Sequence, residues 1–436
     1  MLWNLERREY SHISCSISRC VADCYLAIDL AFEAEDLFDR SLFKEGNSAL
    51  IKDQPVATGA GCGGEMANSR HARNSASGAM VQQLAAVAVR VLVVLAMLQR
   101  APLSRAQFAY YGTNPSDTST PFRIGFYSQS CPSAESIVTQ TLRNRYAVDI
   151  KAPARIMRLF FHECFITGCD GSLLVNATST NPAPEKTATP NLSLAGFDII
   201  DTAKAALEAV CPGVVSCADI EALMTRDAIG MLGGPSFQIP TGRLDTRAVS
   251  TASQATNGLP SPSDSAQTAA IAFSSQGFTI FDFVTLIGAH TVGAASCQTF
   301  SYRLYNYQGT GQATTSMDPG LVATLKTICP DPNNASAAVF PDPTVALDQG
   351  TINTIDNSYY QQLQQGHGIL EIDQNVGMDP FTGAIVTGYA GLGSIGPTMS
   401  FTTNFASVII KMGTLNVITG SPGGQGSIRQ NCAVLN

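Results

Sequence analysis

Tryptophan and histidine are both scarce in this chain, which limits where its chemistry can lie. The only tryptophan among 436 residues is Trp3, and five histidines are present. A histidine-based site must therefore draw on very few side chains. Strand signals are also scant, because alternation of apolar and polar residues is rarely sustained over about four to eight positions. This scarcity argues against an all-β architecture, and we find no internal repeat that would indicate a repeat fold.

Basic residues are outnumbered by acidic ones. The chain has 26 Lys+Arg and 34 Asp+Glu, for a formal net charge of -8 at pH 7. Residues 1–106 carry 11 charges of each sign, so the whole net charge belongs to residues 107–436. A domain with this balance is not expected to bind nucleic acid or another polyanion.

Long apolar runs are absent as well. The best candidate, Val91–Leu98, is far shorter than the roughly 20 residues of a membrane-spanning helix. Arginines precede it, and Ser104-Arg-Ala106 follows it as a small-x-small cleavage site. We therefore expect residues 66–106 to be a signal-peptide region cleaved after Ala106. Residues 107–436 would then be a secreted, extracellular domain without a membrane segment.

Residues 1–65 precede this signal and carry four cysteines in no metal-binding or fold pattern. Translation from Met66 or Met80 would give an ordinary N-terminal signal peptide. We interpret residues 1–65 as an artefact of gene prediction.

Helical apolar spacing recurs along the expected mature domain. The predicted helices are Ala134–Asp149, Ala154–Cys164, Phe197–Val210, Cys217–Leu232, Ser263–Ser275, Ile280–Ile287, Pro319–Ile328, Asn357–Leu363, Pro380–Tyr389 and Thr402–Asn416. Two of them begin with a capping Asp followed by Pro, at Asp318-Pro319 and Asp379-Pro380. The pattern predicts a mostly α domain with little β structure and a sizeable core.

One histidine lies in the stretch Arg158-Leu-Phe-Phe161-His162-Glu163-Cys164. Arg158 and His162 are four residues apart, so on a helix they share one face. An imidazole can move a proton between two oxygens while a guanidinium stabilises developing negative charge. This pair suits cleavage of a peroxide O–O bond, although the spacing alone also fits a core helix whose Arg and His are merely hydrogen-bonded.

A series of ordered motifs favours the peroxide-cleaving pair over the ordinary core helix. They are Phe126-Tyr-Ser-Gln-Ser-Cys131-Pro, Arg158-Leu-Phe-Phe-His162-Glu-Cys-Phe, Gly168-Cys169-Asp170-Gly-Ser172, Pro184-Glu185-Lys, Pro190-Asn191, Cys217-Ala-Asp, Gly258-Leu-Pro260-Ser-Pro, Gly288-Ala-His290-Thr-Val-Gly, Arg303-Leu-Tyr-Asn, Ile355-Asp356-Asn, Asp373-Gln and Lys411-Met-Gly. Together they resemble the class III, or secretory, plant haem peroxidases. The resemblance implies two helical subdomains, distal and proximal, on either side of one haem b. It also implies an enzyme that reduces H₂O₂ while oxidising small phenolic donors by single electrons, as in lignin or suberin formation and the oxidative stress response.

The resemblance assigns roles on the distal side. Arg158 and His162 match the distal acid–base pair, and Phe161 matches the residue that shields the haem edge. Asn191 matches the residue that accepts the second ring N–H of His162, which would keep the free nitrogen basic. Glu185 matches the residue that orients Asn191.

On the proximal side, His290 matches the iron ligand and Asp373 the carboxylate that accepts its Nδ1–H. Such a bond makes the imidazole more anionic and stabilises high-valent iron. Pro260 matches a position that faces reducing substrates.

Two calcium ions are also implied, because hard oxygen ligands suit Ca²⁺. The distal set is Glu163, Ile166, Gly168, Asp170 and Ser172. The proximal set is Thr291, Asp348, Thr351, Thr354 and Asp356. The alternative is polar loops that satisfy their own backbone. The family usually has Asp at position 163, so we expect a weaker or altered distal site.

Eight of the 12 cysteines lie beyond residue 106. Eight cysteines allow 105 pairings in principle, and an even number suits an exported chain. The resemblance implies Cys131–Cys211, Cys164–Cys169, Cys217–Cys432 and Cys297–Cys329. A zinc site on His162, Cys164 and Cys169 is the rival hypothesis, but it lacks a second half.

Several positions depart from the family pattern, namely Phe237, Leu244, Ala195, Thr189 and Thr299, so the reducing substrate is not specified. We expect a monomer, with glycan acceptors at Asn176 and Asn334. The alternative function is a secreted, non-catalytic scaffold that binds haem and calcium. A haem or oxygen carrier is disfavoured by Arg158 and Asp373.

Residues 107–436 contain no tryptophan, so the secreted protein should show tyrosine emission and no indole fluorescence. Emission spectra of the purified protein, excited at the red edge of the tyrosine band, check this expectation. Indole emission would show that Trp3 is retained and that cleavage after Ala106 does not occur.

Overall fold

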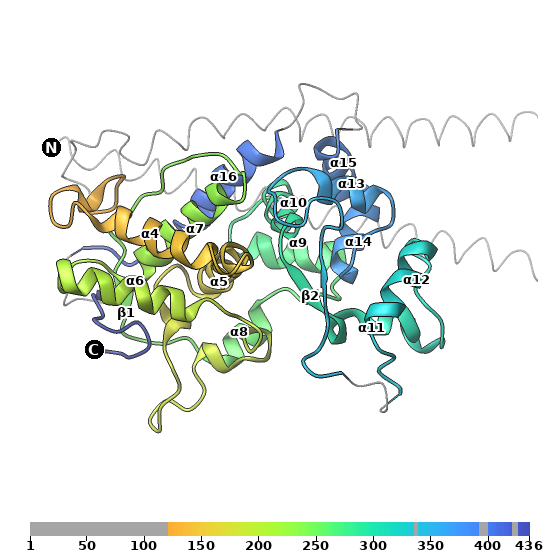
Figure 1. Ribbon diagram of the computed structural model, residues 1–436, viewed down its shortest axis with the longest axis horizontal. Coiled ribbons are helices and arrows are strands. Elements are labelled where there is room, and N and C mark those ends of the chain that lie inside the picture. The colour runs from red at the N-terminus through yellow and green to blue at the C-terminus, as the bar shows by residue number, and fades with distance from the viewer. Residues whose placement is uncertain (1–120, 335–338, 392–399, 421–425) are drawn as a thin grey trace, which may run out of the picture. The chain divides into compact units, whose positions relative to one another are not determined.

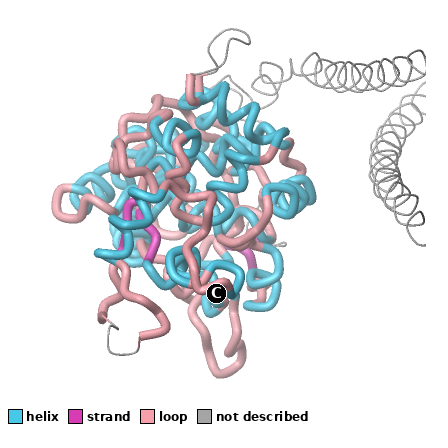
Figure 2. Tube along the Cα trace, turned by 90° about the vertical axis from the view of Figure 1, so that its right-hand side faces the viewer, coloured by secondary structure: helices cyan, strands magenta, loops and turns pink. Residues whose placement is uncertain are grey.

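The computed structural model describes residues 121–334, 339–391, 400–420 and 426–436, all of them within the compact unit Val93–Asn436. The expected signal region 66–106 and the upstream segment 1–65 lie outside the described residues. Helices cover most of the described trace, with two short strand pairs (Figure 2). The predicted mostly α fold is confirmed.

Thirteen α-helices occur in the described residues. They are α4 (Ala134–Tyr146), α5 (Ala152–Ile166), α6 (Phe197–Val210), α7 (Cys217–Met231), α8 (Ala252–Gly258), α9 (Ala266–Ser275), α10 (Ile280–Ile287), α11 (Cys297–Tyr305), α12 (Pro319–Ile328), α13 (Ser358–Gln364), α14 (Glu371–Met378), α15 (Pro380–Tyr389) and α16 (Phe401–Met412). The strands pair antiparallel, β1 (Asp245–Thr246) with β4 (Gly426–Ser427) and β2 (Ala294–Ser296) with β3 (Thr344–Ala346).

The predicted capping residues are confirmed. Asp318 accepts the backbone N–H of Leu321 at 2.8 Å at the start of α12, and Asp379 accepts that of Thr382 at 3.0 Å at the start of α15. Three helices, α8, α11 and α14, were not among those predicted. They are short, and α8 is held by a capping box between Thr251 and Gln254 rather than by an apolar stripe.

The helices form two groups. In the first, α4 packs on α6 and α7, and α5 packs on α7; in the second, α10, α13, α14 and α15 pack together. Figure 1 shows the first group on the left and α13–α15 on the right. Helix α16 contacts both α10 and α5, so it joins the groups. This arrangement agrees with the expected pair of helical subdomains.

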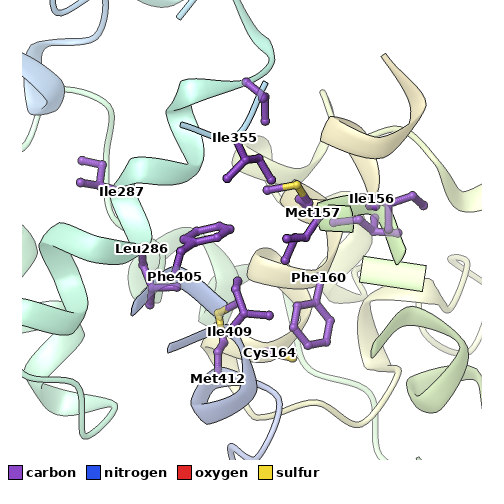
Figure 3. Close-up of a cluster of buried hydrophobic side chains, with 14 of the residues drawn as sticks. Ile156, Met157, Phe160, Cys164, Leu286, Ile287, Ile355, Phe405, Ile409 and Met412 are labelled. Carbon is purple, nitrogen blue, oxygen red and sulfur yellow. The ribbon is translucent and has the colours of Figure 1, made fainter. Parts of the chain in front are cut away.

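Apolar side chains fill the junction between the groups (Figure 3). Phe160 comes from α5, Leu286 from α10, and Phe405 and Ile409 from α16. All four are buried. Burial of such side chains contributes roughly 1.5–3 kcal/mol each, so this cluster helps to fix α5 relative to α10. Among the described residues, no single helix is long and apolar enough to cross a membrane.

The four disulfides implied by the resemblance are confirmed: Cys131–Cys211, Cys164–Cys169, Cys217–Cys432 and Cys297–Cys329. The zinc hypothesis is wrong, because Cys164 and Cys169 are bonded to each other and cannot supply two thiolates.

A fully buried ion pair anchors the start of α7. Asp219 accepts Arg243 Nη1 at 2.7 Å, the Tyr127 hydroxyl at 2.7 Å and the Gly242 N–H at 2.6 Å. Arg243 Nε donates in turn to the Gly413 carbonyl at 3.1 Å, just beyond α16. Both side chains have an exposed fraction of 0%. The pair therefore connects the first group of helices to the C-terminal end of α16.

Removing one member of this pair should be costly, because a buried guanidinium would be left without its counter-ion. We expect Asp219→Ala to lower the free energy of unfolding by about 3–5 kcal/mol. Asp198→Ala, which breaks the exposed pair with Arg145, is the matched control and should cost about 1 kcal/mol or less. Guanidinium titrations followed by circular dichroism measure both, and equal losses would contradict the expectation.

Candidate active site

Helix α5 carries Arg158, Phe161 and His162. Its buried side chains, among them Ile156, Leu159 and Phe160, lie against the core. Arg158 is exposed to solvent, yet desolvation by the surrounding protein lowers its pKa. A guanidinium that is both accessible and partly desolvated lies in a recess rather than on an open surface.

Arg158 is directed by the segment that follows Pro190. Its Nη2 donates to Ser193 Oγ at 3.1 Å and to the Pro190 carbonyl at 3.4 Å, and Nη1 donates to the Ser193 carbonyl at 3.3 Å. This segment adjoins Asn191 in η4 (Thr189–Asn191). One short segment therefore positions both Arg158 and the partner of His162.

The tautomer of His162 follows from its hydrogen bond. Nδ1 lies 2.7 Å from Asn191 Oδ1, and an amide oxygen can only accept, so Nδ1 carries the proton. The Asn191 amide is oriented in turn, because its Nδ2 donates to the Glu185 backbone carbonyl at 2.9 Å. This leaves Nε2 with a lone pair, and no hydrogen bond joins it to any of the described residues.

The protonation state of His162 is equally constrained. Burial, and next the nearby Arg158 cation, lower the pKa of His162 to about 3, while the bond to Asn191 opposes the shift. Both main causes penalise the imidazolium. His162 is therefore a neutral base over the ordinary pH range.

An aromatic cluster begins beside this base. The Phe161 ring stands edge-on to the His162 ring at 5.8 Å between centroids. It also packs on Phe165 at 4.9 Å and on Phe273 of α9 at 5.9 Å. The half-buried Phe161 thus presents an apolar wall beside the imidazole, as expected for a residue that shields a flat apolar group.

The second histidine lies on the turn η5 (Gly288–Thr291), directly after α10. His290 Nδ1 is 2.7 Å from Asp373 Oδ1 at the start of α14. Asp373 is fully buried and also accepts the Tyr359 hydroxyl at 2.9 Å and the Leu370 N–H at 3.0 Å. Three donors therefore hold this carboxylate in place, and the His290 side chain retains an exposed fraction of 31%.

Pro260 follows α8 and is half-buried. Helix α8 packs against η4, which carries Asn191. Two residues after Pro260, the Pro262 carbonyl accepts the N–H of Ile372, the neighbour of Asp373, at 3.0 Å. The segment that contains Pro260 therefore links the turn that carries Asn191, the partner of His162, to the helix that carries Asp373, the partner of His290.

The predicted proximal calcium residues are brought together. Thr291 Oγ1 lies 3.3 Å from Asp348 Oδ2 and 3.1 Å from the Thr354 carbonyl, and Thr351 Oγ1 lies 2.9 Å from Asp356 Oδ1. Asp348 is fully buried. Thr291 directly follows His290, and this all-oxygen set has the chemistry that Ca²⁺ prefers.

Of the predicted distal residues, Gly168, Asp170 and Ser172 lie close to Glu163, but the Glu163 carboxylate is used differently. Its carboxylate accepts the backbone N–H groups of Asp170, Gly171, Ser172 and Leu173, at 3.1 Å for Asp170 and Ser172 and 2.8 Å for Leu173. Ser172 Oγ donates to Glu185 Oε2 at 2.7 Å. The Glu163 carboxylate thus binds the loop at residues 170–173 directly.

The sequence prediction missed Glu221 of α7. This side chain is 1% exposed, and both of its carboxylate oxygens lack a hydrogen-bond partner. Burial raises its pKa to about 8, and burial likewise raises that of Glu185 to about 7. The available signal was a glutamate inside the otherwise apolar stretch Ile220–Met224.

The two histidines have the donor chemistry that haem requires. Each has Nδ1 held by an acceptor, and neither Nε2 is hydrogen-bonded to a described residue. One imidazole stands beside a guanidinium and a phenyl ring, and the other beside a buried carboxylate. This set fits haem, which His290 would hold while His162 acts as a base.

Comparisons with known proteins agree with this fit. A family profile described as "Peroxidase" matches residues 138–391. Peroxidase 57 of Arabidopsis thaliana is 44% identical over 314 residues, which is 72% of this chain and 92% of that protein. Peroxidase N1 of Nicotiana tabacum is 40% identical over 315 residues, or 72% and 90% of the two chains.

The lowered pKa of His162 predicts a rate constant for reaction with H₂O₂ that stays flat on acidification until the pH approaches about 3. Asn191→Asp would place a carboxylate next to the Nδ1–H of His162 and stabilise the imidazolium. The pH of this inflection should therefore rise by about 1–3 units. Stopped-flow pH profiles measure both proteins. Asn144→Asp, on the exposed part of α4, is the control, and an unmoved inflection in Asn191→Asp would contradict the assigned contact.

Proposed function

The chain belongs to the class III plant haem peroxidases, and on that premise we propose specific roles for its residues in the reduction of H₂O₂. The chain is a peroxidase of this family by its family match and its relatives. The single observation that carries the residue assignment is the neutral His162 with its free Nε2 beside the Arg158 guanidinium.

His162 acts as the base and then the acid. Its Nε2 accepts a proton from one oxygen of H₂O₂ and returns it to the other, which leaves as water. The nearby Arg158 guanidinium stabilises the negative charge that develops as the O–O bond breaks. Asn191 and the Glu185 carbonyl keep the His162 ring oriented, and Phe161 limits access from one side.

His290 would hold the haem iron through Nε2. Bound there, haem b supplies the iron that accepts the oxidising equivalents of peroxide and passes them to donors one electron at a time. Asp373 accepts the His290 Nδ1–H and increases the basicity of the ligating nitrogen. Tyr359 and the Leu370 N–H keep Asp373 fixed while it does so.

Small phenolic donors would be oxidised near Pro260. One H₂O₂ and two phenols yield two waters and two phenoxyl radicals, which couple outside the enzyme. This chemistry suits lignin or suberin formation and peroxide removal. Two contacts support this placement of Pro260. It follows α8, which packs against the turn that carries Asn191, and it lies two residues before Pro262, whose carbonyl accepts the N–H of the residue next to Asp373.

We propose that calcium supports both histidines. On the proximal side the ligands are the side chains of Thr291, Asp348, Thr351 and Asp356 with the Thr354 carbonyl. The oxygen contacts among these five residues support this set. On the distal side Asp170, Ser172 and the Ile166 and Gly168 carbonyls remain proposed ligands, whereas both carboxylate oxygens of Glu163 accept backbone N–H groups of the loop at residues 170–173.

We further propose that the mature protein is exported to the apoplast or cell wall and acts as a monomer. The sequence pattern of residues 66–106 and the four disulfides support export. Nothing in the comparisons or the described residues favours the non-catalytic scaffold.

Removing the imidazole of His162 should separate haem binding from peroxide chemistry. We expect His162→Ala to keep a ferric haem absorption band but to react with H₂O₂ roughly 100- to 10,000-fold more slowly. Spectra of the purified protein before and after one equivalent of H₂O₂, and then after guaiacol, measure this. His367→Ala, whose Nδ1 pairs with Gln362, is the matched control. Wild-type rates in His162→Ala would overturn the assignment.

A further inference from the structure

The backbone just before Asp373 determines how this carboxylate meets His290. Residues 368–371 lead into α14, and Asp373 lies in the first turn of that helix. The Leu370 N–H donates to Asp373 Oδ2 at 3.0 Å, while Oδ1 lies 2.7 Å from His290 Nδ1. A shift of the segment 368–371 would therefore turn the carboxylate relative to the imidazole.

Arg303 of α11 holds this segment. Its Nη1 donates to the carbonyls of Gly368 at 2.6 Å and Ile369 at 2.5 Å, and its Nη2 donates to Ser316 Oγ at 3.4 Å. The Arg303 side chain is fully buried. Because one nitrogen binds two consecutive carbonyls, the guanidinium fixes the direction of the backbone immediately before Leu370.

The choice of a cation at this place is informative. The hydrogen-bond acceptors of Arg303 are carbonyls and one hydroxyl rather than a carboxylate, and its Nε is buried without a partner among the described residues. Burial lowers the pKa of Arg303, and the negative charge of Asp373 is the largest effect that opposes this shift. Burying a guanidinium is strongly unfavourable, so a residue that only filled space would not need this charge.

The neighbours of Arg303 in the sequence hold the same segment from its other end. The hydroxyls of Tyr302 and Tyr307 donate to the Glu371 carboxylate at 2.6 and 2.8 Å. The stretch 302–307, which contains the motif Arg303-Leu-Tyr-Asn, therefore contacts residues 368, 369 and 371. This motif has no part in the peroxide chemistry described above.

Close packing transmits the position of the segment to α14. The Gly368 N–H donates to Gln374 Oε1 at 3.0 Å. A Cβ atom on Gly368 would lie only 2.7 Å from the backbone nitrogen of Gln374. Because Gln374 follows Asp373 directly, a displacement at Gly368 is passed to the helical turn that carries the carboxylate.

We propose that Arg303 is a positioning residue for the His290–Asp373 pair, which it supports by binding the Gly368 and Ile369 carbonyls. This inference rests on the role proposed above for His290 as the haem ligand. A well-aligned carboxylate makes the imidazole more anionic, and this lowers the reduction potential of the iron that it binds. Loosening the segment 368–371 should therefore raise that potential.

The test is the midpoint potential of the ferric–ferrous couple, measured on the purified holoenzyme by spectroelectrochemistry. Arg303→Lys keeps the charge, but a single ammonium on a flexible stem lacks the rigid fork of the guanidinium. Asp373→Asn removes the carboxylate and provides the reference shift. We expect Arg303→Lys to raise the midpoint potential by roughly a third or more of the rise in Asp373→Asn.

Arg243→Lys is the matched control. Arg243 is also fully buried, and it donates to the backbone carbonyls of Pro240 at 2.7 Å and Gly413 at 3.1 Å. None of its hydrogen bonds reaches the segment 368–371. This variant should lose stability as Arg303→Lys does but keep the wild-type midpoint potential, which separates positioning of Asp373 from general loosening of the core.

Gly368→Ala serves if Arg303→Lys does not fold. It displaces the same segment while the guanidinium stays, so it should also raise the midpoint potential. A wild-type potential in the folded variant, beside a raised one in Asp373→Asn, would overturn the role of Arg303. An unmoved potential in Asp373→Asn itself would remove the proposed role of the His290–Asp373 pair and this inference with it. Peroxide rates do not enter the measurement, so the assignment of His162 is tested separately.

Discussion

Two hydrogen bonds to histidine Nδ1 determine what this site can do. Asn191 accepts from His162 and Asp373 from His290, each at 2.7 Å. An amide acceptor leaves a neutral base, whereas a carboxylate acceptor makes the ring a stronger electron donor. The same side chain is thereby given two different functions. Every element that holds Asn191 or Asp373 in place therefore contributes to the chemistry, although it never touches a reactant.

The acceptors are held by contacts that are distant in sequence. Asn191 depends on the Glu185 carbonyl, and Glu185 in turn binds Ser172 in the loop that Glu163 anchors. Asp373 depends on Tyr359 of α13. Cys164–Cys169 closes the chain between His162 and that loop. A change in the loop is thus transmitted to His162 through only a few hydrogen bonds, which is why an ion beside the loop would matter for the base.

Much of this arrangement could be predicted from the sequence. Apolar spacing predicted most of the helices, and Asp-Pro pairs predicted where two of them begin. Both signals are local in the sequence, so they do not depend on the fold. The disulfide pairings came from the resemblance, since 105 pairings are otherwise open. Helix α8 was missed because a capping box stabilises it rather than an apolar stripe. Glu221 was missed for a different reason: its spacing is that of an ordinary core helix, and only the fold reveals that its carboxylate is buried without a hydrogen-bond partner.

Asp373 and Glu221 show how burial should be interpreted. Both carboxylates are almost fully buried on helices, but Asp373 is held by three donors and Glu221 by none. The hydrogen bonds of Asp373 are complete within the protein, and one of them orients His290. Glu221 accepts no hydrogen bond from the described residues, and Arg429 is the cation that acts on it most strongly. A buried acid without donors avoids an isolated charge by keeping its proton, and the raised pKa of Glu221, about 8, agrees with this.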